Sequence, residues 1–341
     1  VCLDATFKQT GGDSLAAVQL VALAQQHCKR APPVDMLLDP TVSLRQIGTW
    51  IDTASHREVS FADIHGPAPK TIHAAEVDLR RLIGVAAPLP TPRMGRANHT
   101  LLTGATGFLG RFLLLELLRD AAAHGGHVTC LVRAADDASA RRRLGAAYAG
   151  DGSPLEGFAA QLTVHAGNFA EPRLGLAQAT YERLAAGVDD VLHNGALVNH
   201  ALSYEALFAP NVLGTAELLR FALHRHRKSV AFVSTTGVLN GLPGPLAEDV
   251  GIAEAMPERP LEGGYANGYC TSKWAGEILL AQCCRDYDIP TIIFRSGLIL
   301  GHRQHLGQQN LPRPLAGAIA VGIAALEGPL RHGLGDAHVL R

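Results

Sequence analysis

Short apolar runs alternate with helical patterns from residue 100 to residue 294, and this alternation limits the fold more than any other feature. It favours a parallel sheet with helices on both faces, because each connecting helix must cover one face of the sheet. A doubly wound α/β sheet of this kind binds its ligand beyond the carboxyl ends of its strands. The expected strands are 101–102, 127–132, 162–166, 188–193, 230–234 and 291–294, and helical patterns cover 108–120, 204–224 and 269–285.

The first expected strand runs directly into a glycine-rich loop with G-x-x-G-x-x-G spacing, formed by Gly104, Gly107 and Gly110. Such a loop allows a tight turn, a close approach of the backbone to a pyrophosphate and close packing of the next helix. The helix that begins near Phe108 would offer free amides and the positive end of its dipole to the phosphates. The context of strand, loop and helix predicts a Rossmann-type dinucleotide site.

The end of the second expected strand indicates which dinucleotide is bound. An acidic residue at this position would hold the ribose hydroxyls of NAD, whereas an arginine accommodates the extra phosphate of NADP. The sequence has Arg133 there, followed by the basic run 141–143. A solvated basic helix face would explain the run but not an arginine at the strand tip. We therefore predict NADPH as the cofactor.

A tyrosine and a lysine four residues apart suggest acid–base chemistry. Tyr269 and Lys273 would share one face of a helix, and the chain has only six tyrosines, so a chance pair at this spacing is uncommon. A nearby ammonium stabilises the tyrosinate and makes the phenol usable as an acid and base. The alternative is an exposed pair without chemistry. A hydroxyl from 234–236, after the fifth expected strand, could hold a substrate oxygen beside Tyr269.

The first 54 residues form a different pattern. Gly11, Gly12 and Asp13 precede Ser14, and residues 14–28 have the apolar spacing of an amphipathic helix. A second helix is expected from Asp39, Pro40 and Thr41, with apolar positions Leu44, Ile47 and Trp50. Ser14 is either a site that carries a thioester arm or an ordinary helix N-cap, and the two interpretations are compatible. Residues 55–98 are expected to be a linker, with a short helical pattern at 74–83 that packs on the next domain.

Composition excludes several classes of protein. With 341 residues, 47% hydrophobic and 18% charged, the chain is long enough for two globular domains. A net charge of −1 offers no field for nucleic acid, and no apolar run is long enough to cross a membrane. Neither the six cysteines nor His224 and His226 have metal-ligand spacing, and Cys130 is expected to be a buried thiol. We expect a cytoplasmic protein without a metal.

At family level, the motifs TGATGFLG, NxxGT at 211–215, STTGV, YxxxK and FRSGLILG resemble the extended short-chain dehydrogenases/reductases. The segments LVNHALSYEALFAPNVLGTAELLR and YANGYCTSKWAGE resemble, more narrowly, the thioester reductase domain of carboxylic acid reductases and related terminal domains of nonribosomal peptide synthetases. FKQTGGDSL resembles the phosphopantetheine attachment site of a carrier domain. The resemblance covers nearly the whole chain. It implies a partial all-α carrier domain (1–54), a linker (55–98) and an NADP-binding reductase domain (99–341).

The resemblance also implies roles for individual residues. Ser14 would bear 4′-phosphopantetheine, Tyr269, Lys273 and Thr235 would be catalytic, and Asn211 would support them. Arg133 and Arg143 would take the 2′-phosphate. Asn168 would lie near adenine, where an Asp is more usual. The other expected cofactor contacts are Thr103, Gly104, Thr106, Gly107, Phe108, Leu109, Gly110, Ala196, Ser234 and again Lys273.

The implied reaction is NADPH-dependent release of the carrier-bound acyl group as an aldehyde, with Tyr269 donating a proton and Lys273 assisting. Carboxylic acid reductases tend to carry an acidic residue at the position of Gly297 to stop there, so a second reduction to the alcohol stays open. An upstream adenylation domain would load Ser14 with the acyl substrate after modification by a phosphopantetheinyl transferase. Residues 307–330 would begin a further substrate-binding portion, which makes the chain a fragment of a longer enzyme.

Two other functions remain possible at the level of sequence. A sugar-nucleotide epimerase or dehydratase of the same fold shares the YxxxK pair but has no use for the GGDSL motif around Ser14. A non-catalytic carrier and docking module would require that the reductase part does not bind NADPH.

Overall fold

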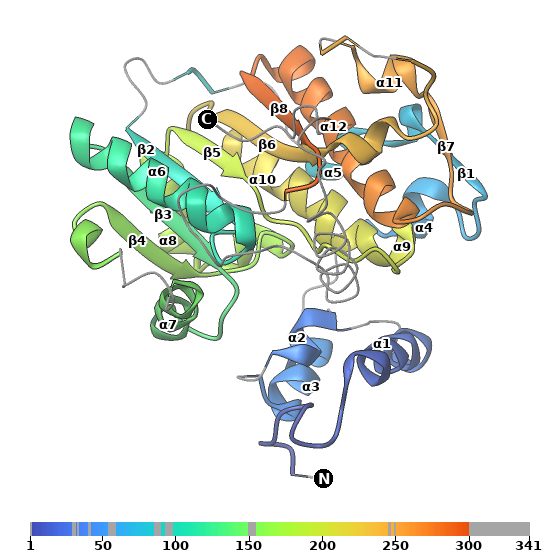
Figure 1. The fold of residues 1–341 in the computed structure, drawn as a ribbon, viewed down its shortest axis with the longest axis horizontal. Helices are drawn as coiled ribbons and strands as arrows, with labels where there is room; N and C mark the ends of the chain where they lie inside the picture. Colours follow the sequence, from blue (N-terminus) through green and yellow to red (C-terminus); the bar gives the residue numbers. More distant parts are fainter. Residues whose placement is uncertain are drawn as a thin grey trace, which may run out of the picture.

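A computed structural model gives the fold of the chain (Figure 1). Its central sheet has six parallel strands in the order β4-β3-β2-β5-β6-β8. From β2 the chain builds the sheet outward to β4 on one side and then crosses back to add β5, β6 and β8 on the other side. The topological switch point therefore lies between β2 and β5. The strands are β2 (His99–Thr103), β3 (His127–Val132), β4 (Leu162–Ala166), β5 (Asp190–His193), β6 (Ser229–Thr235) and β8 (Thr291–Ser296). The structure describes residues 2–28, 32, 34–39, 42–53, 59–84, 90–92, 98–148, 155–244, 247–248 and 250–299.

Helices cover both faces of this sheet, which confirms the doubly wound fold predicted from the alternation. Successive side chains of β2 point to opposite faces, so Leu101 and Leu102 belong to two different hydrophobic clusters. The cluster around Leu102 takes in α6 (Phe108–His124) and α7 (Asp137–Ala147). The cluster around Leu101 takes in α8 (Gln178–Gly187), α10 (Gly214–Ala222) and α12 (Asn267–Tyr287).

The helix expected over 204–224 is interrupted. The structure divides it into α9 (Tyr204–Leu207), a π-helical turn η4 (Phe208–Leu213) and α10. Pro210 lies in the turn and has no N–H for the usual hydrogen bond to the fourth preceding carbonyl, so the regular ladder cannot continue through it. The periodicity of apolar residues does not report this break, because the buried face is kept across it.

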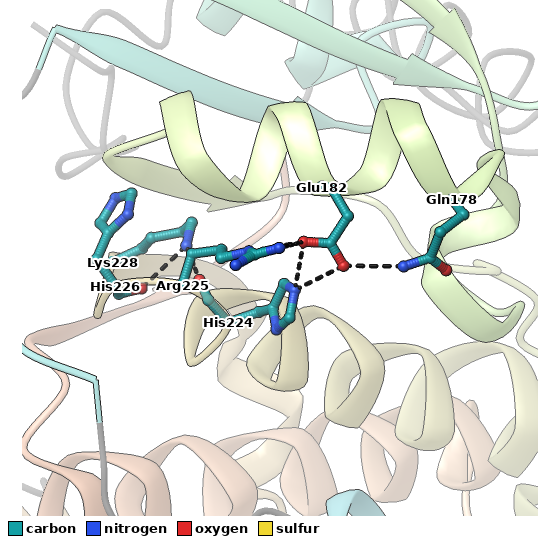
Figure 2. A network of polar contacts seen from close by, with 6 residues as sticks. All are labelled: Gln178, Glu182, His224, Arg225, His226 and Lys228. Carbon is teal, nitrogen blue, oxygen red and sulfur yellow. Dashed lines mark hydrogen bonds and ion pairs between the residues drawn. The ribbon is translucent and has the colours of Figure 1, made fainter.

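The residues after α10 tie this helix to α8 (Figure 2). Glu182 of α8 accepts from Arg225 Nε at 2.7 Å and is hydrogen-bonded to His224 Nε2 at 3.0 Å. Lys228 is buried, and its Nζ donates to the carbonyl oxygens of His224 and His226 at 2.7 and 3.0 Å. The basic and histidine residues therefore stabilise the end of α10, which agrees with their expected place at a polar helix end.

The N-terminal part has a small core of its own, formed by α1 (Ser14–Cys28), α2 (Val34–Leu38) and α3 (Leu44–Thr53) (Figure 1). The helix predicted over 14–28 is confirmed. The second expected helix begins only at Leu44, and α2, which the sequence pattern did not predict, precedes it. Phe7, Ala17, Val34, Leu37 and Ile47 are the buried residues of this core.

Residues 59–83 pack on the sheet domain through short elements. Ile72 of β1 is fully buried in the cluster that also contains α12, and β1 pairs antiparallel with β7 (Glu258–Pro260). Gln282 of α12 accepts from the Leu79 N–H at 2.7 Å and donates to the Val77 carbonyl at 2.6 Å. The remaining short elements are α4 (Phe61–His65), β1 (Thr71–His73), η1 (Ala74–Glu76), α5 (Leu79–Ile83), η2 (Glu156–Phe158), η3 (Pro172–Gly175), η5 (Thr236–Leu239) and α11 (Ile252–Ala255).

Within the described residues, no helix combines the length and apolar character that crossing a bilayer requires. Cys130 is fully buried in β3, as expected, and burial raises the pKa of its thiol far above the usual range. The expected substrate-binding portion at 307–330 lies outside the described residues. The boundaries of the three expected domains stay a prediction.

Candidate active site

A cavity of about 900 Å³ opens at the carboxyl ends of the parallel strands, at the topological switch point between β2 and β5. This is the place at which doubly wound sheets bind ligands. Most of the residues predicted as a site line this one cavity. They are Gly104, Thr106, Gly107, Phe108, Leu109, Arg133, Arg143, Asn168, Ala196, Ser234, Thr235, Tyr269 and Lys273.

The glycine loop is tight enough to exclude side chains. Gly104 has φ +74°, a left-handed conformation that favours glycine. A Cβ on Gly110 would lie 1.9 Å from the Gly104 carbonyl oxygen, so α6 can approach the loop only with glycine here. The same carbonyl oxygen accepts from Gly107 N at 3.0 Å and from Asn194 Nδ2 at 3.1 Å. The loop and the amino end of α6 can hold a pyrophosphate, and the residues present fit a dinucleotide.

Two arginines meet at the end of β3. Arg143, on α7, donates from Nη1 to the Arg133 carbonyl oxygen at 2.8 Å. Burial, helped by the charge of Arg143, lowers the pKa of Arg133 to about 10. Two guanidinium groups that line one cavity create a place where an anion is favourable. They would hold the 2′-phosphate of NADPH.

Tyr269 and Lys273 lie one turn apart on α12 and both line the cavity. Burial raises the pKa of Tyr269 to about 12, with no lowering by Lys273. Lys273 is itself buried, with Nζ 3.7 Å from the centroid of the Phe232 ring, and burial lowers its pKa to about 7 against the opposing charge of Glu277. In this structure the tyrosine is therefore protonated, as a proton donor must be, but burial alone makes it a weaker acid.

Thr235 and Ser234 end β6 beside the tyrosine but face different partners. Thr235 Oγ1 accepts from Gly237 N at 3.2 Å, which places the hydroxyl at the edge of the cavity. Ser234 is buried, and its hydroxyl donates to Glu277 of α12. Ser234 would therefore meet a cofactor through its backbone.

Asn211 and Thr103 support the cavity from behind, outside its lining. Asn211 lies in the π-helical turn, where its Nδ2 donates to the Leu197 carbonyl at 3.1 Å and to Ser272 Oγ at 2.9 Å. Its Oδ1 accepts from Leu197 N at 2.8 Å, so it joins the loop after β5 to α12. Thr103 Oγ1 lies 2.9 Å from His193 Nδ1 and accepts from Gly195 N at 3.0 Å.

Asn168 lines the cavity, but its side chain is engaged in a turn. Its Oδ1 accepts from Ala170 N at 3.0 Å. The same oxygen can accept one more hydrogen bond, and the Asn168 amide nitrogen can donate, which an Asp carboxylate at this position could not do.

Sequence reasoning missed several residues of the site. His200 and Tyr265 line the cavity beside Tyr269, and His200 Nδ1 lies 2.6 Å from the Tyr265 hydroxyl. The His200 and Tyr269 ring centroids are 5.8 Å apart. Glu277 is fully buried under the site. The one feature of the local sequence that could have indicated its role is its position one helical turn after Lys273 on α12.

Ser14 lies in the N-terminal helical part, exposed at the start of α1. Asp13, rather than Ser14, caps the helix, because Asp13 Oδ1 accepts from Ala16 N at 2.8 Å. The N-cap role expected for Ser14 is therefore wrong by one residue. The Ser14 hydroxyl is left accessible to a modifying enzyme.

Within the described residues, no three His, Cys, Asp or Glu side chains gather as metal ligands. The fold and the cavity define a dinucleotide-binding α/β domain joined to a small helical domain with an accessible serine. Residues 102–331 match the male sterility protein family, and residues 2–51 match the phosphopantetheine attachment site family. The chain belongs to the male sterility protein family of NAD-binding domains, and it carries a phosphopantetheine carrier region before that domain.

Curated relatives agree with both matches. The chain is 40% identical to a carboxylic acid reductase of Mycobacterium tuberculosis over 94% of its length, and 38% identical to one of Segniliparus rugosus over the same share. It is also 40% identical to an isonitrile lipopeptide synthase of M. tuberculosis over 95% of its length. The chain spans only 29%, 28% and 13% of these three proteins.

Solved structures agree on the sheet domain. A reductase domain of a nonribosomal peptide synthetase from M. tuberculosis matches 70% of this chain and 58% of that one, with a TM-score of 0.62 and 40% identity. The terminal reductase domain from the myxalamid biosynthetic pathway matches 69% of this chain and 58% of that one, with a TM-score of 0.59 and 36% identity. The resemblance to the reductase domains of such enzymes is therefore confirmed.

Proposed function

We propose that this chain is the carrier and reductase part of a larger enzyme that releases a carrier-bound acyl thioester by NADPH-dependent reduction to an aldehyde. The observation that carries the proposal is that one cavity joins the glycine loop, two arginines and the Tyr269–Lys273 pair. The exposed Ser14 on the same chain would supply the thioester. Relatives named as carboxylic acid reductases and peptide synthetase reductase domains support this function.

Each residue has a defined part in the proposed reaction. NADPH, when bound, supplies the hydride that reduces the thioester carbonyl carbon. Tyr269, which is protonated at neutral pH, donates a proton to the oxygen of that carbonyl. Thr235 holds the same oxygen by a hydrogen bond. The resulting hemithioacetal returns its hydroxyl proton to the Tyr269 tyrosinate as the C–S bond breaks. This gives the aldehyde and the thiolate of the arm, which takes a proton from solvent to become the thiol.

We assign NADPH rather than NADH on the pair of guanidinium groups. Arg133 and Arg143 line the cavity at the end of β3, and the position after that strand carries no acid to hold free ribose hydroxyls. Lys273 would bind the nicotinamide ribose. An upstream adenylation domain and a phosphopantetheinyl transferase are the partners that would load and modify Ser14.

The proposal is tested by loading acyl groups directly onto the carrier region. With a panel of aliphatic and aromatic acyl-coenzyme A substrates, a phosphopantetheinyl transferase would attach an acyl-phosphopantetheine to the Ser14 hydroxyl, which mass spectrometry detects. Adding NADPH should oxidise the cofactor and release an aldehyde, with an alcohol if reduction continues. Ser14→Ala should abolish loading and release. A sugar-nucleotide epimerase would show neither loading at Ser14 nor any thioester-dependent oxidation, and this result would reject the proposal.

A further inference from the structure

Arg143 contacts the helical carrier region as well as the cavity. Its Nη1 donates to Asp39 Oδ2 at 3.0 Å, and Asp39 directly follows α2 of the carrier region. The side chain of Asp39 is only 13% exposed in this ion pair, whereas that of Arg143 is 39% exposed. The same nitrogen of Arg143 also reaches the Arg133 carbonyl oxygen at 2.8 Å. A single guanidinium therefore joins the carrier region to the end of β3.

An anion is needed at this place for a simple electrostatic reason. Arg133 and Arg143 are both cationic, line the same cavity and repel each other. Removing such charges from water without an opposite charge is unfavourable. In this structure, the Asp39 carboxylate supplies the negative charge to Arg143. A carboxylate and a phosphate use the same planar guanidinium donors, so each can replace the other.

We propose that Asp39 of the carrier region and the 2′-phosphate of NADPH compete for Arg143, so that cofactor binding and this docking of the carrier region oppose each other. The inference rests on the proposed function, because it takes Arg143 as a ligand of the 2′-phosphate. NADH has no 2′-phosphate and does not compete. The docked arrangement with the Asp39–Arg143 pair is therefore the one favoured before NADPH binds.

The competition has a reciprocal consequence. If a docked Asp39 weakens NADPH binding, NADPH must weaken this docking by the same factor. The carrier region is released from the Arg143 contact when the cofactor enters, and it becomes free to bring its arm to the loaded cavity. The ion pair thus sets the order of two events: NADPH binds first, and the acyl group on the carrier region enters the cavity second.

The test is a comparison of NADPH and NADH affinities by fluorescence titration of the whole chain. Asp39→Asn removes the negative charge and keeps the shape of the side chain. We expect it to bind NADPH about two- to fivefold more tightly, the range for a partly exposed ion pair, with NADH affinity unchanged. Asp4→Asn is the matched control, because Asp4 pairs at 2.8 Å with Arg45 inside the carrier region. It should leave both affinities unchanged.

A double variant separates competition from an indirect effect. Arg143→Gln should lower the affinity for NADPH. Adding Asp39→Asn to this variant should then leave NADPH affinity unchanged, because the guanidinium for which Asp39 and the 2′-phosphate compete is absent. Small-angle scattering should also show an increase in radius of gyration on adding NADPH but not NADH. Unchanged NADPH affinity in Asp39→Asn, or an equal change for NADH, overturns the inference. Equal affinity of the unaltered chain for NADPH and NADH instead rejects the cofactor assignment of the proposed function.

Discussion

Glu277 and Arg295 form an ion pair beneath the cavity, in which Arg295 donates from Nε at 3.0 Å and from Nη2 at 2.9 Å to Glu277 Oε2. Glu277 is completely buried, and its other oxygen accepts from the Ser234 hydroxyl. One carboxylate of α12 thus holds the ends of β6 and β8 together. Thr235, which follows Ser234 at the end of β6, lies next in sequence to this ion-paired cluster.

Removing the carboxylate should destabilise the protein strongly. Glu277→Ala leaves the half-buried Arg295 charge without its carboxylate partner, and we expect a loss of up to about 3–5 kcal/mol in the free energy of unfolding. Glu277→Gln keeps one hydrogen-bond acceptor and should lose less. The control is Glu116→Ala, because Glu116 is 71% exposed in its pair with Arg119 and should change stability by less than about 1 kcal/mol. Equal losses in urea unfolding for Glu277→Ala and Glu116→Ala would contradict this role.

Local patterns were sufficient to predict the sheet and to pick out segments that line one cavity at its carboxyl end. The glycine loop, the strand tip at Arg133 and the Tyr269–Lys273 pair each lie in one short segment whose spacing specifies its geometry. Every predicted strand exists, because each strand of the central sheet is a short apolar run that stands out from the more polar residues around it.

The residues that the sequence did not reveal are those whose roles depend on partners far away in the sequence. Glu277 acts through Arg295 and Ser234, and Asp39 meets Arg143 across 104 positions of sequence. Periodicity carries no information about such pairs. The sequence likewise predicted that Lys273 lowers the pKa of Tyr269. Burial instead has the largest effect on both groups: it raises the pKa of Tyr269 and lowers the pKa of Lys273. The four-residue spacing of the two residues does not show how deeply they are buried.

Tyr269 should be essential for chemistry but not for cofactor binding. Tyr269→Phe removes the proton donor and keeps the ring, so we expect kcat for thioester-dependent NADPH oxidation to fall by roughly 10²–10⁴-fold. The dissociation constant for NADPH should stay within about twofold of the unaltered value. Tyr181→Phe is the matched control, since Tyr181 lies on α8 outside the cavity lining, and it should leave kcat unchanged. Full activity of Tyr269→Phe in a stopped-flow assay would refute the assignment.

Gly110 should tolerate no side chain. In Gly110→Ala the new Cβ would overlap the Gly104 carbonyl oxygen, so the loop or α6 must move. We expect a loss of about 1–3 kcal/mol in stability and at least about tenfold weaker NADPH binding. Gly145→Ala is the matched control on α7, where a Cβ meets nothing within 4 Å. It should stabilise the protein by about 0.5–1 kcal/mol and leave binding unchanged, and similar results for both variants would refute the argument.

A substitution at Gly297 should show whether this position decides between an aldehyde and an alcohol as the product. It lines the cavity just after β8, and a Cβ built on it meets no atom of the described residues within 4 Å, so these residues leave room for a larger side chain. By resemblance to carboxylic acid reductases, Gly297→Asp should reduce the ratio of alcohol to aldehyde among the products by about fivefold or more, equivalent to about 1 kcal/mol in relative barriers. Gly297→Ala adds bulk without charge and should resemble the unaltered chain. Gas chromatography of the products measures the ratio, and the same ratio in both variants would exclude a role for the charge.

Lys228 should make stability depend on pH in a defined direction. Burial lowers the pKa of its ammonium to about 7 in the folded protein, against the opposing charge of Asp189, whereas the unfolded chain keeps the usual value of about 10.4. Below pH 7 both states are protonated and the folded state bears the full penalty of a buried charge. Between pH 7 and 10 the unfolded chain binds more protons, so stability rises with pH.

The prediction is tested by replacing Lys228 with a side chain that does not titrate. Lys228→Met loses the hydrogen bonds to the His224 and His226 carbonyls at every pH, a constant cost (Figure 2). From pH 6 to pH 9, the free energy of unfolding of the unaltered chain should rise relative to that of Lys228→Met by roughly 2–3 kcal/mol. Urea unfolding at both pH values gives the difference. Parallel pH profiles for the two proteins would show that the lysine titrates normally in the folded state.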